Sequence, residues 1–304
     1  MEFNHKSVLF DEAIASLNLD ETKVIVDGTA GGGGHSKAIA ARAKRLIAID
    51  QDPDAIAVLH ERLDELGNVT IVENNFENLR SVLDELGIEG IDGLLLDLGV
   101  SSFQLDTAER GFSYHADAPL DMRMSKSGLS AADVVNTYSE SALADILFRY
   151  GEEKFARRIA ANIIKAREDK PIATTLELVD IIKAAYPAKA MRDAHPARKT
   201  FQAIRIEVNA ELDRLSRTLE AALECLNSGG RLSVITFHSL EDRMVKETFA
   251  RWVNPCTCPK EFPVCVCGKK PLGTVPFKFK APTAQELKEN PRARSSRLRC
   301  FEKY

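Results

Sequence analysis

Two aspartates that each follow a short apolar run are the residues of this sequence best suited to binding a polar ligand. Asp50 follows the run at 46–49, and Asp97 follows the run at 94–96. A glycine-rich stretch precedes both, with five glycines within residues 28–34. Carboxylates accept hydrogen bonds from hydroxyls and amines, and a glycine backbone without Cβ atoms lets a ligand lie against its amides. The pattern predicts a site for a nucleotide-like ligand.

The glycine-rich stretch predicts a strand, a tight turn and a helix that begins near His35. Its spacing differs from the dinucleotide fingerprint G-x-G-x-x-G, because the third glycine counted from Gly31 falls on Ser36. The turn therefore indicates a nucleotide-like ligand without fixing which cofactor binds. The alternative is a glycine-rich turn that binds no ligand.

Asp50 stands at the expected tip of the second strand. A carboxylate at that position can accept two hydrogen bonds from a ribose diol, and each charge-assisted bond contributes about 1.5 to 3 kcal/mol. The alternative is a solvated loop aspartate beside Asp52 and Pro53, whose proline begins the next helix.

Phe76 follows the third expected strand, at 69–73, and two roles are open to it. The ring could cover an adenine, or it could cap the core above the helix predicted for 78–86. The local sequence does not separate these two roles.

The run at 91–99 is almost continuously apolar, which is typical of a strand buried on both faces. Strands that alternate with helices form a parallel sheet, and the carboxyl ends of its strands meet at one edge. We therefore expect Gly33, Asp50, Phe76 and Asp97 along the same edge of the sheet.

Composition limits the class of protein. The 304 residues are 44% hydrophobic, which indicates a soluble α/β unit with an ample core, and the net charge of −4 argues against a uniformly basic nucleic-acid binder. The first six residues form no apolar leader, and no apolar stretch approaches the roughly 20 residues that span a bilayer. We expect a cytoplasmic protein that does not enter the membrane.

Outside the glycine stretch, the pattern predicts a helix over 7–17 that Ser7 caps, a strand at 231–237, and a last edge strand at 298–301. His238 lies between this fifth strand and a helix that begins near Leu240. Its neighbours Glu241 and Asp242 invite an acid–base role, but a role in shaping the loop is the simpler interpretation.

The alternation of strands and helices stops near residue 106 for about a hundred residues, far more than the roughly 12 that a crossover needs. We expect an α/β core at 1–108 and 209–304 with an inserted helical domain at 109–208. The expected helices of the insert are 141–150, 152–167, 175–185 and a long one from 198 to 226.

Basic residues gather in two places. The insert carries Lys189, Arg192, Arg198, Lys199 and Arg205 against one acid, Asp193, and the end of the chain carries Arg292, Arg294, Arg297 and Arg299. Such a cluster suits a phosphate-binding face, although a solvated helix surface is the alternative.

The order of these features, a glycine loop, an acidic tip on the second strand and an aspartate after the fourth, resembles the class I S-adenosylmethionine-dependent methyltransferases. That cofactor carries no phosphate, which suits a loop without lysine or arginine between 27 and 36. Methylation of an amine needs an acceptor that orients the amine toward the sulfonium methyl group. Asp97 or a backbone carbonyl beside it could supply that acceptor.

Long motifs extend the resemblance over nearly the whole chain. The stretches DGTAGGGGHS, DGLLLDLGVSS, ERGFSY, PLDMRM, YGEEKFARRIA, HPARKTFQAIRIEVN, GGRLSVITFHSLEDRMVK and NPRARSSRLR resemble the ribosomal RNA small-subunit methyltransferase H family. The resemblance implies a Rossmann-like core with an inserted all-helical domain for substrate recognition. It also implies methylation of N4 of a cytosine in the decoding region of 16S rRNA, within the small ribosomal subunit or its precursor.

Carried over motif by motif, the resemblance implies cofactor contacts at Gly33, Gly34, His35, Asp50, Phe76, Asp97 and Gln104. It gives Asp97 the catalytic role and places Gln104 at the methionine end of the cofactor. The phosphate contacts expected from the basic clusters are Arg198, Lys199, Arg205, Arg292 and Arg294. The oligomeric state stays open, a homo-oligomer included.

Four cysteines, Cys256, Cys258, Cys265 and Cys267, fall within twelve residues. Four thiolates can form a tetrahedral zinc site, but C-x-C is tighter than the usual C-x₂₋₄-C spacing, and reduced surface thiols are the alternative.

Two other functions would share parts of this pattern. A DNA amino-methyltransferase would have the same core, and duplex-DNA binding would distinguish it. An RNA-binding assembly factor would keep the basic insert but would not need Asp50 and Asp97.

Overall fold

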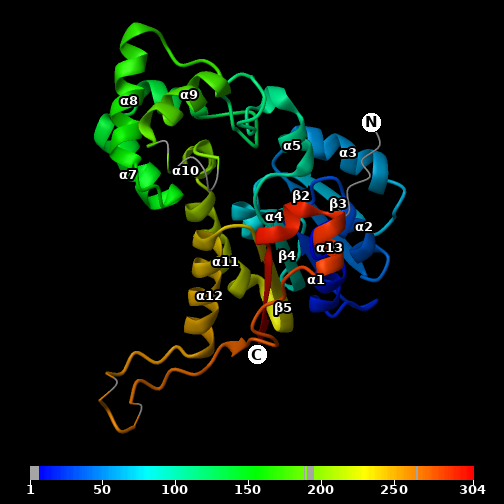
Figure 1. The fold of residues 1–304 in the computed structure, drawn as a ribbon. Helices are drawn as coiled ribbons and strands as arrows, with labels where there is room; N and C mark the ends of the chain where they lie inside the picture. Colours follow the sequence, from blue (N-terminus) through cyan, green and yellow to red (C-terminus); the bar gives the residue numbers. More distant parts are fainter. Residues whose placement is uncertain (1–6, 188, 190–194, 260, 265) are drawn as a thin grey trace. The chain divides into compact units, whose positions relative to one another are not determined.

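A computed structural model describes residues 7–187, 189, 195–259, 261–264 and 266–304 of the chain (Figure 1). The chain forms two compact units. Unit 1 comprises Met1–Gly99 and Asp213–Tyr304, and unit 2 comprises Val100–Leu212. Unit 2 extends beyond both ends of the stretch 109–208, for which the sequence predicts a helical insert.

Unit 1 is built on a seven-stranded sheet with the order β3-β2-β1-β4-β5-β7-β6. The strands are β1 (Val24–Asp27), β2 (Arg45–Asp50), β3 (Val69–Glu73), β4 (Ile91–Asp97), β5 (Leu226–Thr236), β6 (Gly273–Thr274) and β7 (Arg297–Lys303). Strands β1 to β5 run parallel to one another, and β7 runs antiparallel to β5 and β6.

The expected edge strand at 298–301 is not at the edge. β7 pairs with β5 along residues 231–236, and β6 adds two residues to the other side of β7, at Glu302 and Lys303. The short β6 could not be predicted because its two residues carry no alternating pattern.

Alternate residues of the strands face two separate cores. Val26, Ile47 and Leu94 pack on one face, against apolar residues of α4 (Leu79–Glu85), α11 (Glu211–Cys225) and α12 (Ser239–Val253). Ile25, Leu46 and Leu95 pack on the other face. Its covering helices are α1 (Phe10–Ser16), α2 (Gly34–Ala40) and α3 (Pro53–Leu63). A parallel sheet buried on both faces explains the continuous apolar runs of its strands.

The first helix begins later than predicted. α1 starts at Phe10, and its N-cap is Leu9 with a left-handed φ of 49° and no side-chain cap. Ser7 therefore does not cap it. The Ser7 side chain lies instead against Gly34, where a Cβ atom would come within 2.1 Å of its Oγ.

Unit 2 is helical. Its α-helices are α5 (Ser102–Asp106), α6 (Ala131–Thr137), α7 (Glu140–Gly151), α8 (Ala156–Asp169), α9 (Thr175–Ala185) and α10 (Ala197–Asn209). Their apolar faces form one core that includes Leu147, Ile159, Ile182 and Ile204.

The long helix expected over 198–226 is broken. Ala210 has a left-handed φ of 48°, so α10 ends at Asn209 and α11 begins at Glu211. The Asn209 side chain bonds to backbone outside its helix, at Met122 O and Met124 N. Because these partners are distant in sequence, helical periodicity alone could not reveal the break.

The remaining short elements of the described residues are 3₁₀ turns and one short helix. A 3₁₀ turn spans Phe76–Asn78 and another spans Ala108–Arg110, while α13 (Ala284–Glu289) precedes the 3₁₀ turn Pro291–Ser295. Among the residues that the model describes, none belongs to a helix long and apolar enough to cross a membrane.

Candidate functional site

Three carboxylates gather where the central strands of unit 1 end. Asp27, Asp50 and Asp97 are the last residues of β1, β2 and β4, and β1 lies between the other two in the sheet. Desolvation raises the pKa of Asp27 and of Asp97. The charge of Asp50 adds to the effect on Asp27, and the charge of Asp27 adds to the effect on Asp97. The predicted edge therefore exists, with Asp27 as a member that sequence reasoning did not single out.

The Asp50 carboxylate binds the backbone of two segments, the glycine loop and the residues just after β2. Its Oδ2 accepts a hydrogen bond from Gly31 N at 2.8 Å, and its Oδ1 accepts one from Asp52 N at 2.9 Å. Desolvation raises the pKa of Asp50 to about 6, against the lowering effect of these amides. The carboxylate is thus tied to the glycine loop rather than solvated beside Pro53.

The glycine loop is attached to the strands on either side of β1. Gly28 N donates to Leu95 O at 2.9 Å, and Ala30 N donates to Ile49 O at 3.0 Å. Thr29 Oγ1 accepts a hydrogen bond from Asp97 N at 2.6 Å. These contacts fix the loop between the ends of β2 and β4.

The conformation of the loop depends on glycine. Gly31 and Gly33 have left-handed φ values of 51° and 81°, and Gly33 is the N-cap of α2. A side chain would be strained at both positions. At Gly34 the requirement is space, because of the Ser7 contact described above.

Asp27 anchors the start of α2. Its Oδ2 accepts a hydrogen bond from Ser36 Oγ at 2.7 Å, and its Oδ1 accepts one from Thr29 N at 3.3 Å. Desolvation raises the pKa of this fully enclosed carboxyl to about 6. The sequence signal is the Asp-Gly pair at 27–28, where the first strand ends and the glycine loop begins.

His35 faces Asp97 across the edge, with 3.7 Å between His35 Nδ1 and Asp97 Oδ2. Desolvation lowers the pKa of His35 to about 4, so the imidazole is neutral near pH 7 and the contact is not an ion pair. Desolvation raises the pKa of Asp97 well above its usual value, and the charges of Asp27 and Glu241 add to the effect.

Two buried polar atoms at this edge have no hydrogen-bond partner among the described residues. They are His35 Nε2 and Asp97 Oδ1. Most buried polar atoms in native proteins are paired, and an unpaired one calls for an explanation such as a water, an ion or a catalytic role. The His35 ring also stacks on Phe10, with centroids 5.7 Å apart.

Phe76 begins the 3₁₀ turn after β3 and is half-buried. It packs against the core shared with α4, and a Cβ atom on Gly28 would lie 3.2 Å from the Phe76 Cβ. The core-capping contact is therefore present, and the adenine contact stays a prediction.

Gln104 belongs to unit 2, where it closes the capping box of α5. Its side-chain Oε1 accepts a hydrogen bond from Ser101 N at 3.0 Å, and its backbone N–H donates one to Ser101 Oγ at 3.1 Å. The buried side chain thus has a local structural role. Its contact with a cofactor stays a prediction.

The basic residues of α10 differ in their surroundings. Arg198 and Lys199 are exposed, and Lys199 Nζ donates to Glu152 O at 2.9 Å. Arg205 forms a bidentate pair with Glu211, with both N–O distances at 2.8 Å. The charge of Arg205 is therefore balanced within the chain, while Lys189 is exposed and Arg192 and Asp193 lie outside the described residues.

At the end of the chain, Arg292 and Arg294 are exposed on the 3₁₀ turn. Arg297 and Arg299 instead bind Asp242 of α12, at 2.8 Å and 2.7 Å. Arg297 remains 50% exposed beside Asp242, whereas Arg299 is buried, so Arg299 is the member of this cluster whose charge is withdrawn from the surface.

His238 caps α12 by accepting a hydrogen bond from Glu241 N at Nδ1, at 3.4 Å, while Glu241 Oε2 accepts one from Phe237 N at 2.8 Å. This capping box agrees with a role in shaping the loop. Of the four predicted metal ligands, Cys256, Cys258 and Cys267 lie together after α12, and Cys265 lies outside the described residues.

Unit 2 contains a ring cluster that sequence reasoning missed. Tyr114 stacks on His195 with centroids 4.6 Å apart and meets His115 at 4.5 Å and Phe201 at 5.6 Å. The motifs GFSYH and HPARKTF carry these residues but are 80 positions apart, so only the fold brings them together.

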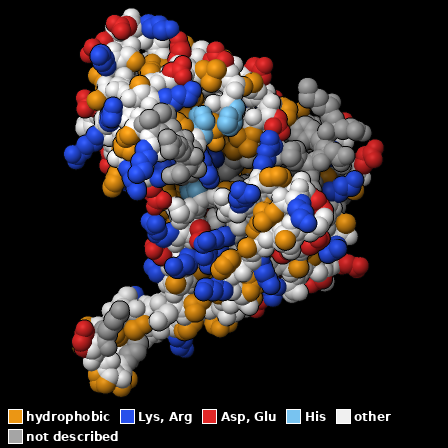
Figure 2. Space-filling view, viewed as in Figure 1, with side chains coloured by type: hydrophobic (Ala, Val, Ile, Leu, Met, Phe, Trp, Pro, Cys, Tyr) orange, Lys and Arg blue, Asp and Glu red, His pale blue; other side chains and the backbone are white. Residues whose placement is uncertain are grey.

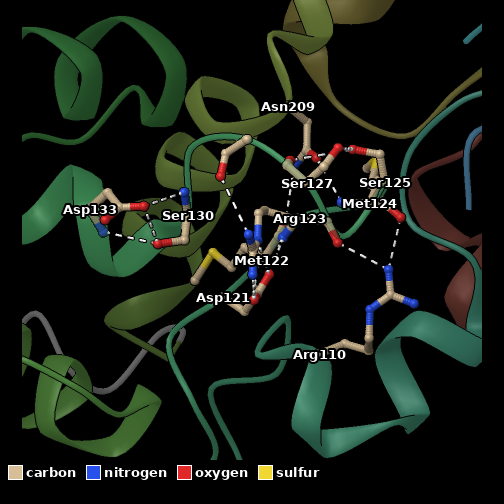
Figure 3. Close-up of polar contacts among 11 residues, drawn as sticks. Arg110, Asp121, Met122, Arg123, Met124, Ser125, Ser127, Ser130, Asp133 and Asn209 are labelled. Carbon is tan, nitrogen blue, oxygen red and sulfur yellow. Dashed lines mark hydrogen bonds and ion pairs between the residues drawn. The ribbon is translucent and has the colours of Figure 1, made fainter.

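A loop of unit 2 around Met122 is held by a group of polar contacts, drawn in Figure 3. Met122 has a left-handed φ of 61°. Its carbonyl accepts from Asn209 Nδ2 at 2.8 Å, and Arg110 Nη2 donates to Arg123 O at 3.0 Å and Met124 O at 2.8 Å. Strain of this kind persists only where the surroundings fix it, which is common at functional sites.

The strand order with a reversed β7, together with acidic residues at the ends of β2 and β4, is that of the class I S-adenosylmethionine-dependent methyltransferase fold. A family model described as the MraW methylase family matches residues 2–304. The chain belongs to that family.

Curated relatives match over the whole chain. "Ribosomal RNA small subunit methyltransferase H" of Lachnospira eligens is 56% identical, covering 100% of this chain and 98% of its own. The protein of the same name from Clostridium botulinum strain Kyoto is 54% identical, with 100% of both chains covered. A solved putative methyltransferase of Streptococcus mutans in complex with SAH is 14% identical, with a TM-score of 0.46 and 97% of each chain covered.

Proposed function

We propose that this chain is a cytoplasmic methyltransferase that transfers a methyl group from S-adenosylmethionine to N4 of a cytosine in the decoding region of 16S rRNA. The observation that carries the proposal is Asp97, a carboxylate at the end of β4 whose buried Oδ1 has no partner among the described residues. Full-length identity of 54% and 56% to the relatives named above supports the RNA substrate.

The residues at the sheet edge suit this cofactor. Asp50 would accept hydrogen bonds from the ribose diol, and Phe76 would cover the adenine. The loop from Asp27 to Ser36 contains no lysine or arginine, as expected for a ligand without phosphate. The unpartnered His35 Nε2 offers a further polar contact.

The cofactor supplies a methyl group already activated on a sulfonium, so the protein mainly has to position the acceptor. An amine N–H of cytosine would donate a hydrogen bond to Asp97 or to an adjacent backbone carbonyl. That bond would align the nitrogen lone pair with the methyl group. As the N–C bond forms, the bond between the methyl group and the sulfonium breaks, and the nitrogen would then pass its proton to the Asp97 carboxylate or to water.

Unit 2 is proposed to recognise the substrate. Arg198 and Lys199 would contact RNA phosphates, as would Arg292 and Arg294 in unit 1, whereas Arg205 already has a carboxylate partner. The net charge of −4 gives no general attraction to polyanions. We therefore propose a folded small-subunit particle, which presents phosphates to both clusters, as the substrate rather than free RNA.

The test is methyl transfer in vitro. Small-subunit particles from cells that lack this protein are incubated with purified protein and labelled S-adenosylmethionine, and the labelled nucleotide is mapped by mass spectrometry. We expect N4-methylcytosine in 16S rRNA from particles and little label in naked rRNA.

Duplex DNA and a short single-stranded oligonucleotide are parallel substrates. Efficient label in duplex DNA would favour a DNA amino-methyltransferase, and equal turnover on the oligonucleotide would contradict the particle requirement. The Asp97→Asn variant should bind cofactor but transfer methyl groups much more slowly. Full turnover by that variant would remove Asp97 from the proposed mechanism.

A further inference from the structure

The segment between α12 and β6, residues 254–272, has almost nothing to hold it in place by packing. None of its described residues is buried, and Figure 1 draws it in orange as an extended excursion beyond the end of α12. Loops longer than about 12 to 15 residues without secondary structure are uncommon, and they are usually either functional or linker segments.

Large apolar side chains are exposed near the tip of this excursion, as Figure 2 shows. Phe262 is 51% exposed, Val264 70% and Val266 72%. The hydrophobic effect therefore does not stabilise the fold of the segment. An interaction other than apolar packing must therefore hold the segment together.

The three described cysteines of the segment have converged. The sulfurs of Cys256, Cys258 and Cys267 all lie within 4.8 Å of one another. The Cys256–Cys267 distance is 3.9 Å, close to the roughly 3.8 Å between two sulfurs of a tetrahedral zinc site with Zn–S bonds near 2.3 Å. It is far longer than the roughly 2.05 Å of a disulfide bond.

The backbone around the sulfurs also resembles that of a ligand loop. Val266 N donates a hydrogen bond to Cys258 Sγ at 3.3 Å. Hydrogen bonds from a backbone N–H to sulfur orient and stabilise metal-bound thiolates. Gly268, directly after Cys267, has a left-handed φ of 66°, a conformation that favours glycine.

We infer that Cys256, Cys258 and Cys267 bind one zinc ion, which cross-links the excursion. The short C-x-C spacing does not prevent this, because both sulfurs of the pair already lie within the 4.8 Å cluster. Thiolates select zinc over magnesium and calcium, which prefer oxygen ligands. The fourth cysteine of the motif, Cys265, lies outside the described residues. The inference does not depend on the methyltransferase function.

The first experiment measures zinc in full-length, tag-free protein purified with a reductant and without chelators. We expect about one zinc per chain, and about tenfold less in Cys256→Ser and in Cys267→Ser. Cys225→Ser is the matched control, because Cys225 is buried on α11, in a core that does not include the segment. Circular dichroism verifies that each variant is folded.

A second measurement does not depend on zinc content at purification. Protein stripped of metal is titrated with Co²⁺, whose thiolate charge-transfer absorption should appear in the wild type and in Cys225→Ser but weaken in the other two variants. Stripped protein should also be cleaved faster by protease within 254–272, with an unchanged unfolding midpoint for unit 1.

The inference would be overturned if wild-type protein contained no stoichiometric zinc and gave no thiolate–cobalt absorption. It would also be overturned if zinc survived Cys256→Ser, or if mass spectrometry detected a disulfide among these cysteines in reduced preparations. Equal loss of zinc in Cys225→Ser would likewise contradict the assigned ligands.

Discussion

Asp50 Oδ2 accepts a hydrogen bond from the Gly31 amide at 2.8 Å, so the end of β2 directly holds the glycine loop that follows β1. The same carboxylate is the proposed ribose ligand. Substitution of Asp50 should therefore remove the proposed ribose contact and also loosen the glycine loop.

Asp50→Ala should weaken binding of S-adenosylmethionine by roughly 2 to 4 kcal/mol, because two charge-assisted hydrogen bonds are lost. Titration calorimetry measures the affinity. Asp64→Ala is the control, since Asp64 is an exposed carboxylate that pairs with His60 on α3. Unchanged affinity in Asp50→Ala would move the ribose contact to another residue.

The affinity for S-adenosylmethionine should depend on pH through Asp50. Desolvation raises the pKa of this carboxyl to about 6, and the diol binds best to its charged form. Affinity should therefore be constant above that pKa and fall below it, by at most about tenfold per pH unit. In Asp50→Asn the affinity should be low and should lack this dependence, and a persistent slope would assign it to another group such as Asp27.

Stability of the ligand-free protein should change with pH in the opposite direction. Desolvation raises the pKa of Asp27 to about 6 from an ordinary value of 3.8, so the folded state binds protons more tightly than the unfolded state. This contribution is present at low pH and is lost as pH rises through about 6. Asp27→Asn should flatten the profile in denaturant unfolding between about pH 4 and 6, the interval between the unfolded and folded pKa values, in buffers of equal ionic strength.

Gly111→Ala should destabilise unit 2 strongly. Gly111 has φ of 72°, and an added Cβ would lie 2.4 Å from Pro119 O and 2.7 Å from Asp121 N, both backbone atoms. Gly128→Ala is the matched control, because φ there is 83° but no atom lies within 4 Å. The control should cost about 1 to 2 kcal/mol for its left-handed backbone, and Gly111→Ala should cost more.

Two probes separate the units in that experiment. The single tryptophan, Trp252, lies in unit 1, so its fluorescence reports that unit, whereas circular dichroism reports both. Equal destabilisation by the two glycine variants would show that the loop yields to the added methyl group.

Removal of Arg198 and Lys199 should lower the salt dependence of RNA binding. Each lost phosphate contact should reduce the slope of log K against log salt by about 0.7 to 0.9. The control is Arg149→Ala, whose side chain is 61% exposed and pairs with Asp145 on α7. An unchanged slope in the Arg198→Ala/Lys199→Ala double variant would show that these charges only solvate the helix.

The sequence alone was sufficient to predict the parallel core and the edge where its strands end. The apolar runs before Asp50 and Asp97 are local signals, and the carboxyl ends of parallel strands necessarily share one edge. The glycine loop was predictable for the same reason, because left-handed φ at Gly31 and Gly33 is a local requirement.

Tertiary structure decided which polar residues remain available to a ligand. Arg205 and Arg299 look like phosphate ligands in the sequence, but Glu211 and Asp242 balance their charges, and Asp242 is 57 positions from Arg299. The helix break at Ala210 likewise accompanies side-chain bonds from Asn209 to a loop more than 80 positions away. Periodicity describes a chain's neighbours in sequence, whereas charge pairing and helix breaks depend on neighbours in space.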